Sequence, residues 1–145
     1  MATVEKSVLI GHSASKMYAL VADVDAYPQF LPWCSGTEVK KLEPNRAAAT
    51  LHVNYHGLRL HFTTENQMEP GALIDMKLMN GPFKHLDGYW RFVSLSEQAC
   101  KIEFQLRYEL SGKLVEKIAG PVFSHIADTL VEVFVKRAAI LYGPG

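Results

Sequence analysis

Three histidines lie close together in the sequence and could form part of a metal site. His52, His56 and His61 are candidates because imidazole nitrogens are common zinc ligands. If His56 and Gly57 form a tight turn, His52 and His61 face each other on the solvent side of a hairpin, and His56 stays in the turn. No carboxylate or third histidine is expected beside this pair, whereas zinc takes three or four ligands. We therefore predict no metal site.

A second group has the residue types of an acid–base cluster. His125, Asp128 and Glu132 follow one another at spacings of three and four, which places them on one face of a helix. That face lies opposite the apolar side of the same segment, and Glu132 with Lys136 forms an ordinary exposed pair at i and i+4. A solvated stripe is the favoured interpretation.

Two side chains could act as nucleophiles, but neither has the sequence context that this chemistry needs. Ser124 is not part of a G-x-S-x-G turn and has no partnered base. Cys34 follows an apolar loop, and nothing around it indicates the electropositive surroundings that activate a thiol. Cys100 is far away, which argues against a disulfide scaffold and a cysteine-built zinc site. We predict no catalytic residue and no catalytic cofactor.

The charge balance argues against nucleic acid as a general ligand. The 145 residues contain 15 Lys and Arg and 15 Asp and Glu, so no overall field attracts DNA, RNA or an anionic membrane. DNA binding is not expected. Neighbouring carboxylates offset the positive charge of the short basic groups. These groups are Lys40, Lys41 and Arg46, Lys84 with Arg91, and Lys136 with Arg137.

The hydropathy pattern predicts a single soluble domain over residues 1–145. Hydrophobic residues make up 48% of the chain, which is enough to build one core without stabilising disulfides or metal ions. The first six residues do not resemble a signal peptide, and no run of eighteen uncharged apolar residues occurs. The expected location is the cytoplasm, either free or at the surface of the inner membrane.

Most of the chain alternates between apolar and polar residues, which is typical of strands with one buried face. In the hairpin around His56 and Gly57, the predicted register pairs Val53 with Leu60 and Leu51 with Phe62. The expected strands cover residues 4–10, a segment around 40–41, the hairpin between 47 and 68, and residues 74–78, 86–93 and 100–108.

Helices are expected on both sides of this series of strands. Ser13 is a plausible N-cap for a helix over about 14–24, and two prolines allow only a turn or a structured loop over 25–33. Residues 112–142 form a long apolar helix that Gly120-Pro121 should kink or divide. Its apolar side advances by four from Leu114 through Ile118 to Phe134.

These elements predict an α+β fold in which a curved antiparallel sheet of about seven strands wraps around the long C-terminal helix. The space between helix and sheet is either a solid core or an apolar ligand cavity. The loop from Tyr27 to Trp33 is either the mouth of that cavity or a plug. The candidate ligand-binding residues are Tyr27, Phe30, Leu31, Trp33, Phe62, Met76, Leu78, Phe83, Trp90, Phe92, Phe104, Leu106, Tyr108, Phe123, Ile126, Ala127 and Leu130.

Two separated segments resemble a known family. Residues 21–34, VADVDAYPQFLPWC, are similar to the signature of the coenzyme Q-binding START-domain family, which includes bacterial RatA-type proteins. Residues 80–92 resemble that family's G-P-F-K-x-L-x-G-x-W-x-F segment, and residues 100–104 resemble its next strand. The similarity extends from about Val4 to Tyr142, nearly the whole chain.

The resemblance implies a helix-grip fold of the START and Bet v 1-like kind. It also implies binding of an isoprenoid quinone such as ubiquinone, without catalysis, in support of respiration or quinone biosynthesis. Tyr27, Trp33, Trp90 and Tyr108 could offer the head group aromatic surface and donors. RatA-type members are described instead as toxins that associate with the large ribosomal subunit. We predict binding and delivery of an isoprenoid quinone, with ribosome association and inhibition of translation as the alternative. Polyketide cyclase-like activity is a distant third, and contact with a membrane surface is a further expectation.

Overall fold

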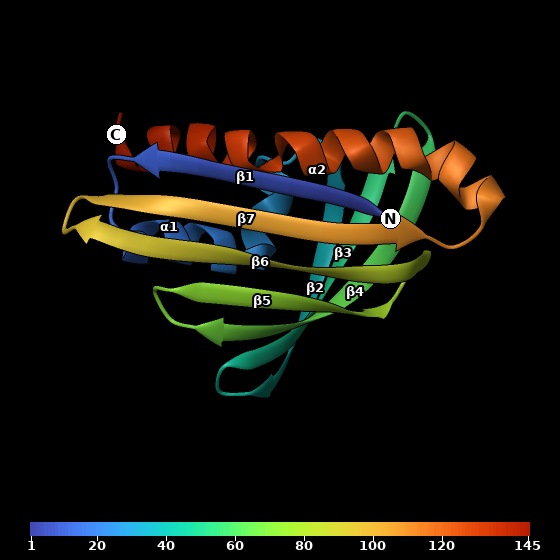
Figure 1. The fold of residues 1–145 in the computed structure, drawn as a ribbon, viewed down its shortest axis with the longest axis horizontal. Coiled ribbons are helices and arrows are strands. Elements are labelled where there is room, and N and C mark those ends of the chain that lie inside the picture. The colour runs from blue at the N-terminus through green and yellow to red at the C-terminus, as the bar shows by residue number, and fades with distance from the viewer.

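Seven antiparallel strands curl around one long C-terminal helix in the computed structural model, which describes all residues from 1 to 145 (Figure 1). The predicted α+β fold is therefore confirmed. The elements are β1 (Ala2–Ile10), α1 (Ala14–Ala22), the 3₁₀ helix η1 (Val24–Gln29), β2 (Cys34–Glu43), β3 (Arg46–Tyr55), β4 (Leu58–Glu69), β5 (Leu73–Asn80), β6 (Phe83–Ser96), β7 (Ala99–Leu110) and α2 (Lys113–Tyr142).

The sheet order is β1-β7-β6-β5-β4-β3-β2, so β1 joins the far side of an otherwise consecutive meander. The predicted hairpin register is confirmed: Val53 pairs with Leu60 and Leu51 with Phe62. At the tip, His56 has φ 49° and Gly57 has φ 83°. Positive φ at both central residues is the geometry of a tight hairpin turn, which explains why a glycine occupies the second position.

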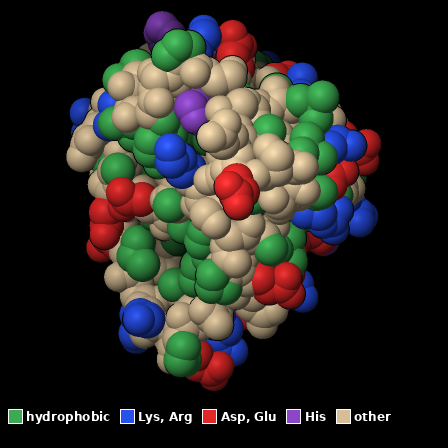
Figure 2. Space-filling view, turned by 90° about the vertical axis from the view of Figure 1, so that its left-hand side faces the viewer, with side chains coloured by type: hydrophobic (Ala, Val, Ile, Leu, Met, Phe, Trp, Pro, Cys, Tyr) green, Lys and Arg blue, Asp and Glu red, His purple; other side chains and the backbone are tan.

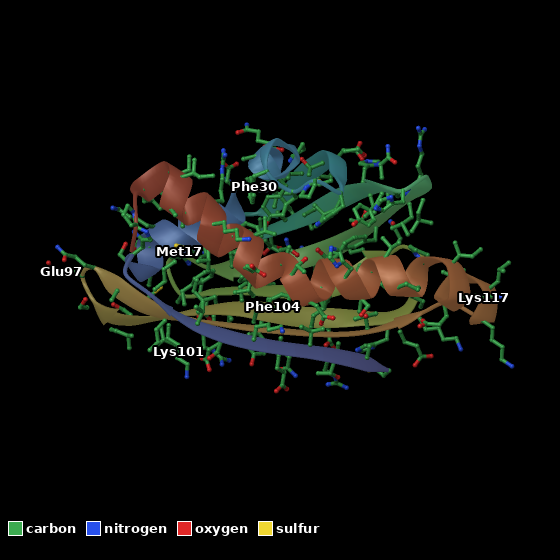
Figure 3. The ribbon with its side chains drawn as sticks, turned by 90° about the horizontal axis from the view of Figure 1, so that it is seen from above. Met17, Phe30, Glu97, Lys101, Phe104 and Lys117 are labelled. Atoms are coloured by element: carbon green, nitrogen blue, oxygen red, sulfur yellow. The ribbon has the colours of Figure 1, made fainter.

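The short helical insert between β1 and β2 also agrees with the sequence. The Ser13 hydroxyl accepts a hydrogen bond from the backbone N–H of Lys16 at 3.1 Å, as an N-cap does. The helix α1 ends at Ala22, two residues earlier than predicted, and η1 follows with Pro28 inside it. The insert lies against the concave side of the sheet beside α2 (Figure 3).

The helix α2 runs without interruption over 30 residues, so the predicted division at Gly120-Pro121 is wrong. Ala119 and Phe123 belong to the core between α2 and the sheet, and Gly120 is buried beside the Glu116 side chain of the same helix. This packing holds the helix together although Pro121 cannot donate a backbone hydrogen bond. The first turns of α2 tilt away from the axis of the rest of the helix (Figure 1), which is the kink that the sequence predicted as the alternative.

Leu114 and Ile118, in the first two turns of α2, do not contribute to the core, in contrast to the predicted apolar arc, whereas Val115 packs against it. Leu114 is 70% exposed and Ile118 is 57% exposed. Lys117, on the same turns, lies at the outer end of the molecule, past the end of the sheet (Figure 3). By length and composition alone α2 could cross a membrane, but from Ala119 onward its apolar face packs on the sheet.

Candidate ligand-binding cavity

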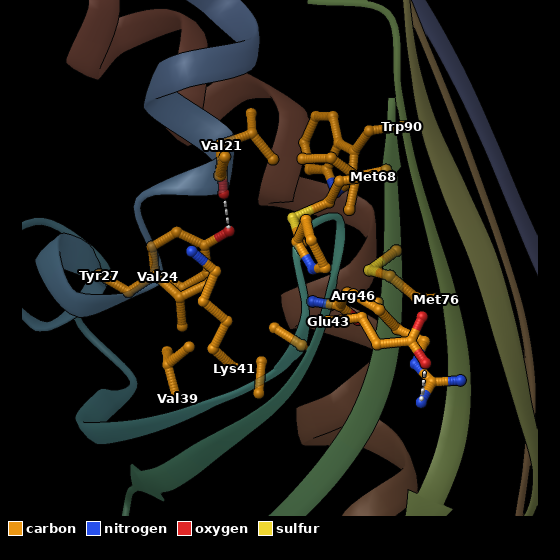
Figure 4. Close-up of a pocket in the computed structure, with 16 residues that line it drawn as sticks. Val21, Val24, Tyr27, Val39, Lys41, Glu43, Arg46, Met68, Met76 and Trp90 are labelled. Atoms are coloured by element: carbon orange, nitrogen blue, oxygen red, sulfur yellow. Dashed lines mark hydrogen bonds and ion pairs between the residues drawn. The ribbon is translucent and has the colours of Figure 1, made fainter. Parts of the chain in front are cut away.

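Two adjoining chambers lie between the sheet and the helices. The outer chamber has a volume of about 230 Å³ and is walled by α1, η1, β2, β3, β4, β5 and Trp90 (Figure 4). The inner chamber, of about 80 Å³, lies beneath α2. The two chambers share six lining residues, which are Val24, Tyr27, Ala49, Asn66, Met76 and Trp90.

The room in this cavity comes from small side chains on β3. Ala47 and Ala49 both line it, and their partners across the pair β3–β4 are Asn66 and Thr64. Alanine side chains leave space that a leucine or valine at the same inward positions would fill, as Leu51 and Val53 do further along the strand. The cavity therefore follows from the composition of one strand rather than from the curvature of the sheet alone.

Most of the predicted ligand-binding residues surround the inner chamber. Tyr27, Met76 and Trp90 line both chambers and lie where the two meet. The predicted residues that line the inner chamber are Tyr27, Trp33, Phe62, Met76, Trp90, Phe104, Leu106, Phe123, Ile126, Ala127 and Leu130.

Six predicted residues lie outside both chambers, either within the solid parts of the core or, for Phe30 and Leu78, partly buried against it. Phe83 and Tyr108 pack against Phe123, with ring centroids 4.9 and 4.7 Å away. Phe30 packs on the ring of Phe134 at 5.2 Å. The six residues are Phe30, Leu31, Leu78, Phe83, Phe92 and Tyr108.

The loop from Tyr27 to Trp33 forms a wall and a plug rather than the mouth. Leu31 and Trp33 are buried, and the Tyr27 hydroxyl donates a hydrogen bond to the Val21 carbonyl (Figure 4). The charged lining of the outer chamber lies instead at the turn between β2 and β3, from Lys41 to Arg46. The inferred route into the cavity thus passes this turn and not the aromatic loop.

The rim of the cavity carries paired charges. The guanidinium of Arg46 lies 3.3 Å from the carboxylate of Glu43 and 3.9 Å from that of Glu65. Lys41 belongs to the same lining and forms no ion pair. Because these groups are partly exposed, their ion pairs contribute little to stability, but they keep the entrance polar while the walls behind it are apolar.

Two polar residues inside the cavity were not among the predicted ones. Thr64 and Asn66 are both buried, and the Thr64 hydroxyl donates to Asn66 Oδ1 at 2.7 Å. Their positions follow from the predicted hairpin register. After Leu51–Phe62, the next pairs on the inward face are Ala49–Thr64 and Ala47–Asn66. The register carries this signal in the sequence, whereas apolar and aromatic side chains alone do not reveal the two polar positions.

The histidine pair on the outer surface needs one correction. A carboxylate does lie beside it: Glu38 Oε2 is 3.0 Å from His52 Nε2. His61 stacks obliquely on His52 with ring centroids 5.5 Å apart. No group of three or more potential ligands comes together anywhere in the chain, so this surface gives no support for a metal site.

The other candidate reactive groups lie away from the cavity or are poor nucleophiles. His125, Asp128 and Glu132 are exposed, and Glu132 pairs with Lys136 at 3.2 Å, as predicted. Burial raises the pKa of both cysteine thiols, Cys34 and Cys100. A raised pKa lowers the thiolate fraction, which makes either cysteine a poor nucleophile.

The buried hydroxyl of Tyr27 makes stability sensitive to alkaline pH. Burial raises the pKa of Tyr27 far above that of a free tyrosine, and charges at Cys34 and Asp23 add to this. Above about pH 10 the unfolded chain releases this proton while the folded chain retains it, so stability falls as pH rises. We expect Tyr27→Phe to lower the free energy of unfolding by about 1 kcal/mol at neutral pH and to show a smaller further loss at alkaline pH than the wild type. Urea unfolding at neutral and alkaline pH measures both effects, and parallel losses in the two proteins would contradict the assignment.

Comparison with known proteins places the chain in a family. The family described as "Polyketide cyclase / dehydrase and lipid transport" matches residues 10–135. The ribosome association toxin RatA of Pseudomonas aeruginosa is 43% identical over 140 residues, covering 97% of both chains. The mitochondrial coenzyme Q-binding protein COQ10 homolog B of Xenopus laevis is 28% identical, over 95% of this chain and 58% of that protein.

A solved structure gives the same result for the fold. The solution structure of the protein CC1736 from Caulobacter crescentus superimposes with a TM-score of 0.74 at 28% identity, over 99% of both chains. The seven-stranded curved sheet with a long C-terminal helix is thus the START-like helix-grip fold that the sequence predicted. By the family match over most of its length, this chain belongs to the polyketide cyclase/dehydrase and lipid transport family.

Proposed function

We propose that this protein is a non-enzymatic, ribosome-associating member of the family that acts on the large subunit as a translation inhibitor. The observation that carries the proposal is the 43% identity to a ribosome association toxin over 97% of both chains. Similarity at this level and coverage involves the surface as well as the core, because a shared fold alone is compatible with far lower identity.

The charge distribution predicts how such an association would respond to salt. The chain has no net charge, and basic and acidic side chains are interspersed on the face shown in Figure 2. Few phosphates can therefore be neutralised at once, and the slope of log affinity against log salt scales with that number. We expect a shallow salt dependence, unlike that of a strongly basic RNA-binding protein.

Sucrose-gradient sedimentation with isolated ribosomal subunits tests this proposal. The protein should migrate with the large subunit and not with the small one, and a moderate increase in salt should release only part of it. In a translation reaction, adding the protein should lower the yield of product. Failure to migrate with the large subunit at any salt concentration would overturn the proposal.

The cavity supports a second candidate function, the binding of an isoprenoid quinone such as ubiquinone. Its walls are apolar, with Trp90 and Tyr27 at the junction of the two chambers. Volumes of about 230 and 80 Å³ suit a substituted ring and the first part of a tail. A long tail would extend past the turn between β2 and β3, where a membrane or a partner would have to cover it.

Organic extraction of the purified protein followed by mass spectrometry tests the quinone proposal. We expect a quinone to be recovered, or to be taken up when a short-tailed one is offered. Neither outcome depends on the ribosome. A protein that carries no quinone and takes none up would eliminate this function and leave the first one standing.

The proposal that the protein is not an enzyme is based on what lines the cavity. The Tyr27 hydroxyl is engaged with a backbone carbonyl, and the acidic and basic side chains of the lining lie at the rim, in ion pairs apart from Lys41. No nucleophile with a partnered base points into either chamber. The likeness to an aromatase/cyclase from Streptomyces, with a TM-score of 0.69 at 20% identity, concerns the fold alone.

A further inference from the structure

Asn66 presents an unpaired hydrogen-bond donor among the mainly apolar residues at the junction of the two chambers. Its side chain is only 8% exposed, and it lines both chambers. The Thr64 hydroxyl occupies Asn66 Oδ1, at 2.7 Å, whereas Asn66 Nδ2 has no partner within the chain. Two side-chain nitrogens are both inaccessible to solvent and without a hydrogen-bond partner, Arg46 Nε and Arg137 Nε. Asn66 Nδ2 is not one of them, so it retains access to the cavity that the residue lines.

A buried amide with a free donor is costly unless something accepts from it. Leaving a buried polar group unpaired costs about as much as a lost hydrogen bond. The neighbouring inward positions are small or apolar, with Ala47 opposite Asn66 on β3 and Met76 opposite it on β5. Asn66 Oδ1 satisfies the buried Thr64 hydroxyl, but an acceptor alone would do this, so that hydrogen bond does not account for the free Nδ2 donor.

We propose that Asn66 is the polar anchor of the cavity and that it selects amphiphiles that carry a carbonyl oxygen at the junction of the two chambers. This inference rests on the proposed ligand-binding function and deepens it. The carbonyl accepts a hydrogen bond from Asn66 Nδ2, and the attached ring or chain lies on Trp90 and Met76, which line the same junction. A purely hydrocarbon lipid would leave the donor unpaired.

Thr64 acts as a positioning residue for this anchor. Its hydroxyl donates to Asn66 Oδ1, which engages the acceptor end of the amide and leaves Nδ2 as the end free to bond a ligand. A second threonine on the same strand, Thr63, is equally buried but bonds Thr50 on the other face, at 2.7 Å, and lines neither chamber. The two threonines therefore form a matched pair of test and control.

The test compares two probes on the full-length protein by equilibrium dialysis, with the bound probe quantified by mass spectrometry. One probe is a quinone with a saturated alkyl tail, and the other is an alkylbenzene with the same tail and no acceptor. Loss of one buried hydrogen bond should weaken quinone binding to Asn66→Leu about tenfold. Binding of the alkylbenzene should be unchanged or tighter.

Thr64→Val should weaken quinone binding by a smaller factor and leave the alkylbenzene unaffected, and Thr63→Val should change neither. If the wild type binds neither probe, the ligand-binding function itself fails. If both probes bind and Asn66→Leu weakens both equally or neither, the function stands and the anchor is wrong. If a bound water accepts from Nδ2 and no ligand does, the experiment gives this last result, and the anchor is wrong.

Stability provides a second readout with the opposite sign. If Asn66 serves a ligand, Asn66→Leu in a Thr64→Val background, where no buried hydroxyl is left without its acceptor, should move the urea midpoint of the ligand-free protein upward relative to Thr64→Val alone, because an unpaired buried donor is removed. If the amide serves only the fold, the same variant should lose stability. A lowered midpoint together with unchanged quinone binding would overturn the proposal.

Discussion

Ala49→Leu is expected to weaken quinone uptake about fiftyfold. Ala49 lines both chambers on β3. Leucine adds three carbons, which at about 30 Å³ for each water-sized group occupy a volume comparable to that of the inner chamber. A ligand that loses contact for about three methylene groups, at about 0.8 kcal/mol each, binds about fiftyfold more weakly. Equilibrium dialysis with a short-tailed quinone measures the effect.

The neighbouring position offers a matched control for this substitution. Ala48→Leu adds the same three carbons to the opposite face of β3, away from both chambers. We expect Ala48→Leu to bind quinone like the wild type. If Ala49→Leu folds and still binds the quinone with unchanged affinity, the ligand lies outside this cavity.

The same variant separates the two proposed functions. Ala49 is buried, so its substitution does not alter a surface that could contact the ribosome. Ala49→Leu should therefore migrate with the large subunit as the wild type does if ribosome association does not require a bound ligand. If the variant instead loses both activities while remaining folded, occupancy of the cavity controls the association.

The register of the strands could be predicted because its determinants are local. The turn at His56-Gly57 fixes which residues face each other, and alternation fixes which face is buried. Both the hairpin pairing and the order of the elements were confirmed. The helix-grip fold then follows, because a single long helix must cover the apolar face of the whole sheet.

The entrance to the cavity could not be predicted in the same way. Its position depends on which end of the curled sheet closes, and that is set by contacts between distant segments. The aromatic loop closes one end because Phe30 and Tyr27 pack on Phe134, more than a hundred residues later. The sequence therefore left open whether the apolar loop is a mouth or a plug, and the basic residues near Arg46 were interpreted as part of a solvated surface.

The exposed start of α2 has a similar explanation. Leu114 and Ile118 continue the apolar spacing of the helix, and periodicity alone assigns them to the core. They are exposed because the helix begins beyond the end of the sheet, so nothing remains for them to pack against (Figure 3). The spacing of side chains determines which face of a helix is apolar, but the length of the sheet determines how much of it is buried.

Phe134→Ala is expected to lower the free energy of unfolding by about 3–5 kcal/mol, the cost of removing a large buried ring. Phe134 is 1% exposed. Its ring lies 5.4 Å from that of Tyr27 and 5.2 Å from those of Phe30 and Trp90, so it joins α2 to the aromatic loop and to β6. Ile140→Ala, on the same helix at a position 74% exposed, should change stability by less than about 0.5 kcal/mol. Urea unfolding followed by circular dichroism compares the two variants. A loss below about 1 kcal/mol for Phe134→Ala, where a buried ring predicts several, would mean that α2 does not hold the closed end of the cavity in place.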